Sequence, residues 1–227
     1  MEILPGPGTV GTELGIGDHH LIFASGNCVK GAGGFDFVSV KIDGSHIVFF
    51  LGDFKTLLTF RKAQIIYDLT FHFAHTFLNR GDRTIDQMIQ AARSGKQNIA
   101  EGSAAGVTSM ETAIKLTNVA KASFQELLLD YEDFLRVRNF RQWEKDSAEV
   151  AFLRKKSVDN SVPDQWFVEL GKSRPAETVA NMVICFLHQE DYLLQAQLNA
   201  LEKKFLVLGG FKEQMFSARL KERNKNN

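Results

Sequence analysis

The sequence predicts an all-α fold, an antiparallel up-and-down four-helix bundle with an inserted short helix and a C-terminal helical suffix. Three observations predict it. From about residue 54 onward, apolar residues recur at the 3.6-residue period of a helix. Short segments join the first three periodic stretches, which favours antiparallel neighbours. Hydrophobic residues make up 44% of the 227 residues and charged residues 24%, ordinary proportions for a chain that buries a core.

Residues 1–52 differ in composition from the rest and are interpreted as a Gly-rich extension. Ten of the 18 glycines lie at or before Gly44. Residues 35–42 and 46–51 have strand character, and Asp43-Gly44 between them is a hairpin turn signal. A lone hairpin is marginal in water, so it would need to pack on the bundle. Two interpretations stay open: a packed hairpin, or a disordered leader translated from an upstream start codon.

Residues 53–207 form the predicted bundle, with an insertion at 138–175. The first long helix is expected at 55–78, the second from Thr84 to a break at 101–106, the third at 109–137 and the fourth at 176–206. Thr84 with Gln87, and Thr108 with Glu111, have the spacing of a capping box. Gly95 lies inside the apolar stripe of the second helix, where another backbone is expected to approach closely.

The insertion is predicted to hold one short helix at 141–156, followed by a loop at 157–175 that contains two prolines. After Gly209-Gly210 the chain is expected to turn into a basic suffix, residues 208–227, with a short helix at 211–223. The apolar side of that helix, Phe211, Met215 and Phe216, is predicted to dock on the bundle or on a neighbouring subunit and leave the bases exposed. The alternative is a frayed basic tail.

A motif in the second and third helices carries a family resemblance. It consists of Asn98-Ile99-Ala100-Glu101-Gly102, then Glu111 in the next helix, then Ser123-x-x-Glu126-Leu127. This pattern resembles the bacterial four-helix-bundle family of 23S rRNA intervening-sequence proteins and of the accessory variability determinants of diversity-generating retroelements. The chain after this motif resembles a subgroup of the same family that has a C-terminal suffix. The whole resemblance covers residues 57–223.

The resemblance implies a small helical bundle that assembles as a homopentamer. It also implies nucleic acid and a reverse transcriptase as partners in the retroelement branch, and no enzymatic activity. From position alone, Asn98 and Glu101 are expected to bond loose backbone groups at a helix end or a neighbouring helix. Gly102 fits a left-handed position after a helix. The motif residues Asn98, Glu101, Gly102, Glu111, Ser123 and Glu126 are therefore interpreted as structural.

Nucleic-acid binding would have to come from local patches, because the formal net charge is zero. Residues 203–227 alone hold seven bases against two acids. In each basic group the alternative is a set of solvated surface charges. The candidate contacts are Arg93 and Lys96 in the second helix, Arg154, Lys155 and Lys156 in the insertion, and Lys203, Lys204, Arg219, Lys221 and Arg223 near the C-terminus.

No catalytic constellation, metal site or cofactor site is predicted. Asp68, His72 and His75 share one helix face, but no second helix offers a matching Glu-x-x-His pair; His19, His20 and Cys28 make a weaker set still. The glycines from Gly6 to Gly11 match a dinucleotide fingerprint but lack the strand and helix that it needs.

Two functions are therefore expected. The first is a non-enzymatic homo-oligomeric scaffold or adaptor, and the alternative is a nucleic-acid-binding accessory protein that acts with a reverse transcriptase or with rRNA. No apolar run predicts a membrane span, and a cytoplasmic protein with both cysteines reduced is expected. The oligomer is also expected because apolar residues lie off the main stripes of the first and third helices and need a partner: Ile66, Phe71, Phe77, Ile114, Phe124 and Leu128.

Overall fold

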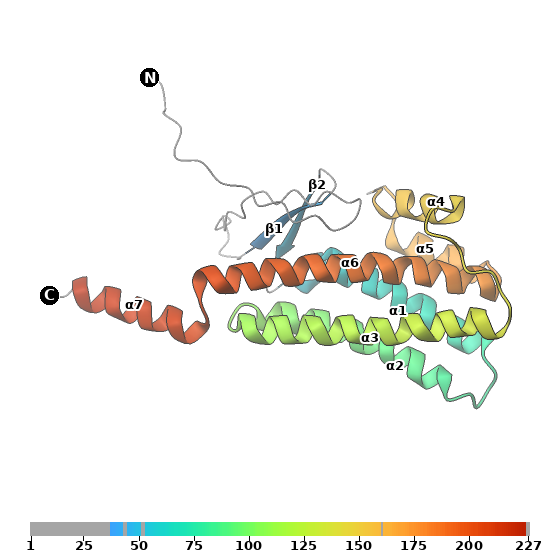
Figure 1. The fold of residues 1–227 in the computed structure, drawn as a ribbon, viewed down its shortest axis with the longest axis horizontal. Coiled ribbons are helices and arrows are strands. Elements are labelled where there is room, and N and C mark those ends of the chain that lie inside the picture. The colour runs from blue at the N-terminus through green and yellow to red at the C-terminus, as the bar shows by residue number, and fades with distance from the viewer. Residues whose placement is uncertain (1–36, 43–44, 51–52, 160, 226–227) are drawn as a thin grey trace, which may run out of the picture.

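The computed structural model describes residues 37–42, 45–50, 53–159 and 161–225, and over them the prediction of a mainly helical protein is confirmed (Figure 1). The four longest helices, α1, α2, α3 and α6, lie side by side, and α3 packs between α2 and α6. The helices are α1 (Leu58–Phe77), α2 (Thr84–Ala105), α3 (Met110–Val137), α4 (Ala148–Ser157), α5 (Asp164–Lys172), α6 (Ala176–Leu208) and α7 (Phe211–Lys225).

Two strands precede the helices, β1 (Phe37–Ile42) and β2 (Ser45–Phe50). They pair antiparallel, with Phe37 opposite Phe50 and Ile42 opposite Ser45, and β1 runs beside α6. A 3₁₀ turn, η1 (Phe54–Thr56), leads into α1. The predicted turn at Asp43-Gly44 and most of the N-terminal extension lie outside the described residues. The choice between hairpin and leader, and the boundaries at 52 and 207, stay predictions.

Helix α2 continues through the predicted break and ends at Ala105. The prediction of a left-handed backbone at Gly102 was wrong, since this glycine lies inside the helix. Its role is close packing: a Cβ placed there would lie 3.3 Å from the Leu116 Cβ and 3.4 Å from the Ala113 carbonyl oxygen of α3. Gly95 differs from its prediction too, because the group that approaches it is the Phe124 ring and not a backbone.

Neither predicted capping box forms, and a different residue supplies the oxygen acceptor at the start of each helix. The Asp82 carboxylate accepts the Thr84 backbone N–H at 2.9 Å, while no side chain caps α2 from its N-cap position. The N-cap of α3 is Ser109, whose Oγ accepts the Thr112 backbone N–H at 3.2 Å. In each case a neighbouring oxygen acceptor reaches the free N–H groups of the first turn.

The insertion holds two short helices where the sequence predicted one helix and a loop. Residues 141–147 are not helical, because Asn181 of α6 bonds their backbone: its Oδ1 accepts the Trp143 N–H at 2.7 Å and its Nδ2 donates to the Arg141 carbonyl at 2.9 Å. The unpredicted α5 begins after Pro163, and Pro175 directly precedes α6. Both prolines thus mark helix starts, although they were interpreted as loop residues.

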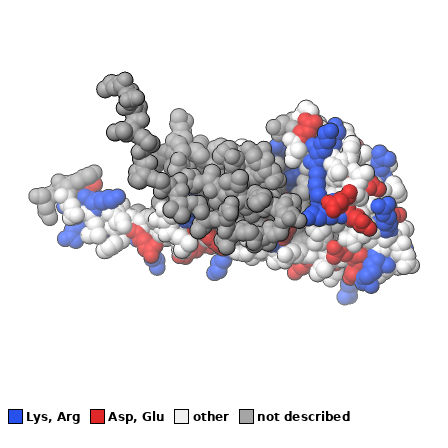
Figure 2. Space-filling model, turned by 45° about the horizontal axis from the view of Figure 1, so that its top comes forward, with Lys and Arg blue, Asp and Glu red and all other residues white. Residues whose placement is uncertain are grey.

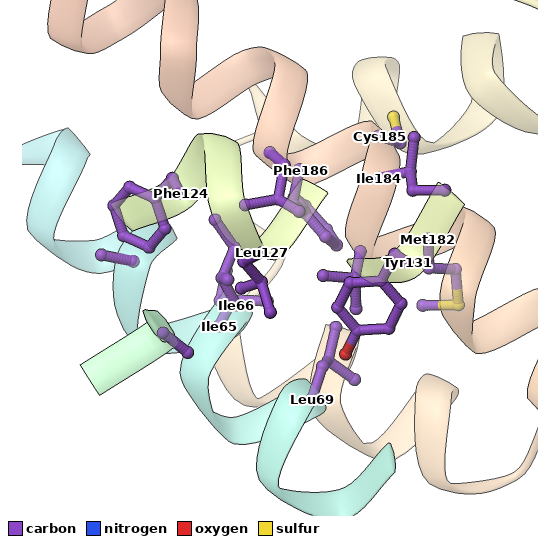
Figure 3. Close-up of a cluster of buried hydrophobic side chains, with 14 of the residues drawn as sticks. Ile65, Ile66, Leu69, Phe124, Leu127, Tyr131, Met182, Ile184, Cys185 and Phe186 are labelled. Atoms are coloured by element: carbon purple, nitrogen blue, oxygen red, sulfur yellow. The ribbon is translucent and has the colours of Figure 1, made fainter. Parts of the chain in front are cut away.

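One apolar core joins α1, α3 and α6 (Figure 3). Leu69, Leu127 and Phe186 are fully buried in it, and the hydroxyl of Tyr131 donates to the Thr70 Oγ1 at 3.1 Å. Ile66 and Phe124, predicted to face a partner, are 0% and 3% exposed. Their burial weakens that argument for an oligomer, but Phe71 is 48% exposed and Phe77, Ile114 and Leu128 are half-buried, so the bundle covers these faces only in part.

Candidate interaction surfaces

The side chains of Asp68, His72 and His75 bond to other residues of α1. The Asp68 carboxylate accepts from Gln64, His72 Nδ1 contacts the Thr76 hydroxyl, and His75 Nδ1 contacts the Phe71 carbonyl oxygen. Over the described part of the chain no group of three His, Cys, Asp or Glu side chains is placed to hold a metal. His19, His20 and Cys28 lie outside that part. None of the described helices offers a stretch long and apolar enough to cross a bilayer.

The motif residues of α2 and α3 make a polar contact between these two helices. Asn98 Nδ2 donates to the Ser94 carbonyl at 2.9 Å, and the Ser94 and Ser123 hydroxyls lie 2.9 Å apart. Asn98 therefore bonds the helix interior and not a helix end. Glu101 and Glu111 are exposed. The motif thus divides into an internal polar contact and exposed carboxylates.

A groove of about 640 Å³ runs between α2 and α3 beside this contact, and we call it the acidic groove. Burial, together with the nearby Asp133 and Glu126 carboxylates, raises the pKa of Asp130. Among the described residues no base forms an ion pair with the carboxylates of the groove, so the groove repels phosphate and attracts cations. Its lining consists of Asp86, Gln87, Gln90, Ala91, Ser94, Ser123, Glu126 and Asp130.

Lys96, a predicted candidate for phosphate contact, is half-buried between α2 and α1. Its Nζ donates to Gln64 Oε1 at 3.2 Å and lies 4.0 Å from the centroid of the Tyr67 ring. Burial lowers the pKa of Lys96. These contacts fasten α2 to α1. Arg93, one turn earlier, is exposed.

The bases of the insertion lie on α4, the helix that also carries the exposed aromatic residue Phe152. Arg154 and Lys155 are exposed, and Lys156 is half-buried. Phe152 is 48% exposed, and its ring centroid lies 6.3 Å from that of Trp166 in α5. We call these five residues the α4 surface. Figure 2 shows bases and acids mixed over the end of the molecule that carries α4 and α5.

The C-terminal helix α7 does not lie on its own bundle, which excludes that form of the predicted docking (Figure 1). Gly209 turns the chain with φ of 70°, a value that favours glycine. The turn is held by Glu213, which accepts the Gly210 N–H at 2.7 Å, and by Gln214, which donates to the Gly209 carbonyl at 3.0 Å. α7 therefore leaves the bundle in a defined direction.

Apolar and basic side chains are both exposed at this end. Of the candidate bases, Lys203, Arg219, Lys221 and Arg223 are exposed and Lys204 is half-buried, and Figure 2 shows bases along the projecting helix. The exposed apolar residues are Leu206 and Val207 at the end of α6, and Phe211, Met215, Phe216 and Leu220 in α7.

A buried polar cluster between α1, α4 and α6 was missed at the sequence level. Lys62 Nζ donates to Gln189 Oε1 at 2.8 Å, and the Ser157 hydroxyl donates to the same oxygen at 2.8 Å. Glu190 is 0% exposed, and neither carboxylate oxygen has a hydrogen-bond partner among the described residues. Burial raises the pKa of Glu190 well above its usual value and lowers the pKa of Lys62, while their mutual attraction opposes both shifts.

Searches with this chain against protein-family models, curated proteins and solved structures find no match.

Proposed function

We propose that this chain is a non-enzymatic, homo-oligomeric helical scaffold or adaptor of the 23S rRNA intervening-sequence protein type. One observation carries the proposal: six large apolar side chains stand exposed together on the end of α6 and on α7. Large exposed apolar side chains gathered at one end of a folded protein mark a contact with another macromolecule. The motif resemblance adds a pentamer as the expected state.

Light scattering coupled to size-exclusion chromatography tests the assembly. The purified chain at micromolar concentration is expected to elute with a molar mass several times that of one 25.5 kDa chain. The apparent mass should fall on dilution, as for any reversible assembly. A single species of one-chain mass at tens of micromolar would contradict the scaffold proposal.

A second candidate function, a nucleic-acid-binding accessory protein, is favoured by the α4 surface. Exposed bases beside an exposed ring suit a single strand, whose phosphates pair with bases and whose nucleobases stack on aromatic rings. The acidic groove and the internal contacts of Lys96 favour α4 over α2 as the binding face. A reverse transcriptase as a further partner rests on the resemblance alone.

Fluorescence anisotropy with a labelled single-stranded RNA tests this function. We expect the dissociation constant to rise about tenfold or more between 50 and 200 mM salt, because phosphate contacts release counterions. Replacing Arg154, Lys155 and Lys156 by Ala should weaken binding and flatten that dependence. Replacing exposed Lys55 by Ala is the control. Weak binding that ignores both salt and the triple replacement would contradict the assignment.

A further inference from the structure

The helix α7, which we call the C-terminal arm, carries basic and apolar side chains in an unusual arrangement. At about 100° per residue, Lys212, Arg219 and Arg223 fall within about 40° of one another and form one basic stripe. Phe211 and Met215 flank this stripe on one side, and Phe216 and Leu220 flank it on the other. The predicted division into one apolar side and one basic side was therefore wrong, because the bases lie between two apolar edges.

A surface that binds this arm needs carboxylates that can pair with the basic stripe. The acidic groove has this character: Asp86 of α2 and Glu126 and Asp130 of α3 line it, and none is ion-paired among the described residues. Asp130 is half-buried. A base brought into the groove would offset the repulsion between these carboxylates.

The arm does not lie in the groove of its own chain (Figure 1). It begins at the N-terminal end of α3, where a Cβ placed on Gly210 would lie 3.5 Å from Glu111 Oε1. The α3 residues of the groove, from Ser123 to Asp130, lie about 18–28 Å further along that helix at 1.5 Å per residue. The arm points the other way, beyond the end of the bundle (Figure 1).

We propose that the C-terminal arm of one copy docks in the acidic groove of a second copy. This inference rests on the homo-oligomer proposed above and names the two surfaces that build it. Two different surfaces meet, so the interface is heterologous, and repetition of the same contact gives a closed ring or an open filament.

Charge and area both favour a second copy as the occupant. Pairing of arm with arm would bring two basic stripes together, whereas arm in groove brings bases to carboxylates. The four apolar side chains of the arm expose on the order of 400 Å², given about 150–250 Å² for a whole aromatic side chain. Together with the basic stripe between them, this is a substantial part of the roughly 800 Å² that each partner buries in a standard interface.

Charge reversal on each surface tests the proposal. The arm-reversed variant carries Lys212→Glu, Arg219→Glu and Arg223→Glu, all at exposed positions. It should keep the far-ultraviolet circular dichroism of a helical protein while the dissociation constant of assembly rises about tenfold or more. Reversal of three exposed bases elsewhere, at Lys55, Lys145 and Arg174, is the matched control and should leave assembly unchanged.

The groove-reversed variant carries Asp86→Lys, Glu126→Lys and Asp130→Lys, and it should also dissociate. A version with Asp130→Asn in place of Lys keeps the test usable if a lysine at this half-buried position prevents folding. The decisive measurement is an equimolar mixture of arm-reversed and groove-reversed chains. Each arm then meets a groove of opposite charge on the other chain, so the mixture should assemble again, as oligomers in which the two chains alternate and whose number of chains is even.

The outcomes separate this inference from the proposed function. A monomeric wild-type chain overturns both. A wild-type oligomer that the arm reversal leaves intact overturns the arm contact alone, and the scaffold proposal stands on another surface. Dissociation of both variants without recovery in the mixture overturns the pairing of arm with groove.

Discussion

At the scale of single residues, the pair of Lys62 and Glu190 couples the stability of the bundle to pH. Both side chains are buried, Lys62 at 6% and Glu190 at 0% exposure. The folded-state pKa of Glu190 lies above its unfolded value, which is near 4.3. Its contribution to stability is therefore complete below about pH 4.3 and is lost as pH rises towards the folded-state pKa. The charge of Lys62 limits this loss.

Replacing Lys62 by Met should cost about 3–5 kcal/mol of unfolding free energy at pH 8, because it leaves a buried carboxylate uncompensated. The cost should be much smaller at pH 4.5, where Glu190 is protonated. Urea denaturation at the two pH values measures both costs. The control Lys55→Met, at an exposed lysine, should change stability by less than about 0.5 kcal/mol at either pH. An equal cost of Lys62→Met at both values would show that the two groups are not coupled.

The residue scale also shows where sequence reasoning stopped. It noticed that Gly95 and Gly102 are unusual inside helices, but their neighbours come from α3 and not from the local sequence. A side chain off the main helical stripe was interpreted as an interface residue. Ile66 instead meets the core, because α1 is packed by α2, α5 and α6 around its circumference. Periodicity records how much of a helix is apolar and not which neighbour covers it.

At the scale of elements, helix ends depend on the oxygen atom that reaches the first turn. Thr108 and Ser109 are adjacent residues that can both cap a helix, with Ser somewhat preferred over Thr. In the structure the Ser109 Oγ accepts the Thr112 N–H, whereas the Thr108 hydroxyl donates backwards to the Ala105 carbonyl at 3.3 Å. The backbone conformation between α2 and α3 decides between them, and that conformation follows from the packing of the two helices.

We expect Ser109→Ala to destabilise the protein by about 1 kcal/mol through loss of the N-cap. Thr108→Ala should stay within about 0.5 kcal/mol, since an exposed hydroxyl that bonds one carbonyl is readily replaced by water. Thermal and urea denaturation of the two single variants side by side measure the difference. If Thr108→Ala destabilised the protein more than Ser109→Ala, the N-cap would be Thr108, as in the predicted capping box with Glu111.

At the scale of the whole molecule, the bundle and the C-terminal arm are expected to be energetically separate. The helices α1, α3 and α6 share one core, while the large apolar side chains of α7 are exposed. Helix α7 by itself is 15 residues long, near the lower limit for a marginally stable helix in water. Its order in solution should therefore increase when a partner covers it.

A chain cut after Gly210 should keep the unfolding free energy of the bundle within about 0.5 kcal/mol. The comparison must be made at a concentration where the full chain is monomeric, because assembly adds stability by mass action. A chain cut after Ser173, which lacks α6, is the control and should not fold, since it loses buried residues such as Val183 and Leu194. A large loss on removing the arm alone would mean that α7 packs on its own bundle.

The sequence by itself determined the helical class, the approximate spans of α1, α3 and α6, and the turn at Gly209, because periodicity and glycine conformations are local properties of the chain. It also determined which bases lie in the suffix. Only the tertiary structure decided that Lys96 contacts the Tyr67 ring and the Gln64 side chain. It also decided that α5 forms where two prolines suggested a loop. It alone placed Glu190 beside Lys62 and gathered Asp86 with Glu126 and Asp130 in one groove. These arrangements join residues far apart in the chain, and the packing of whole helices, which a local pattern does not encode, sets their distances.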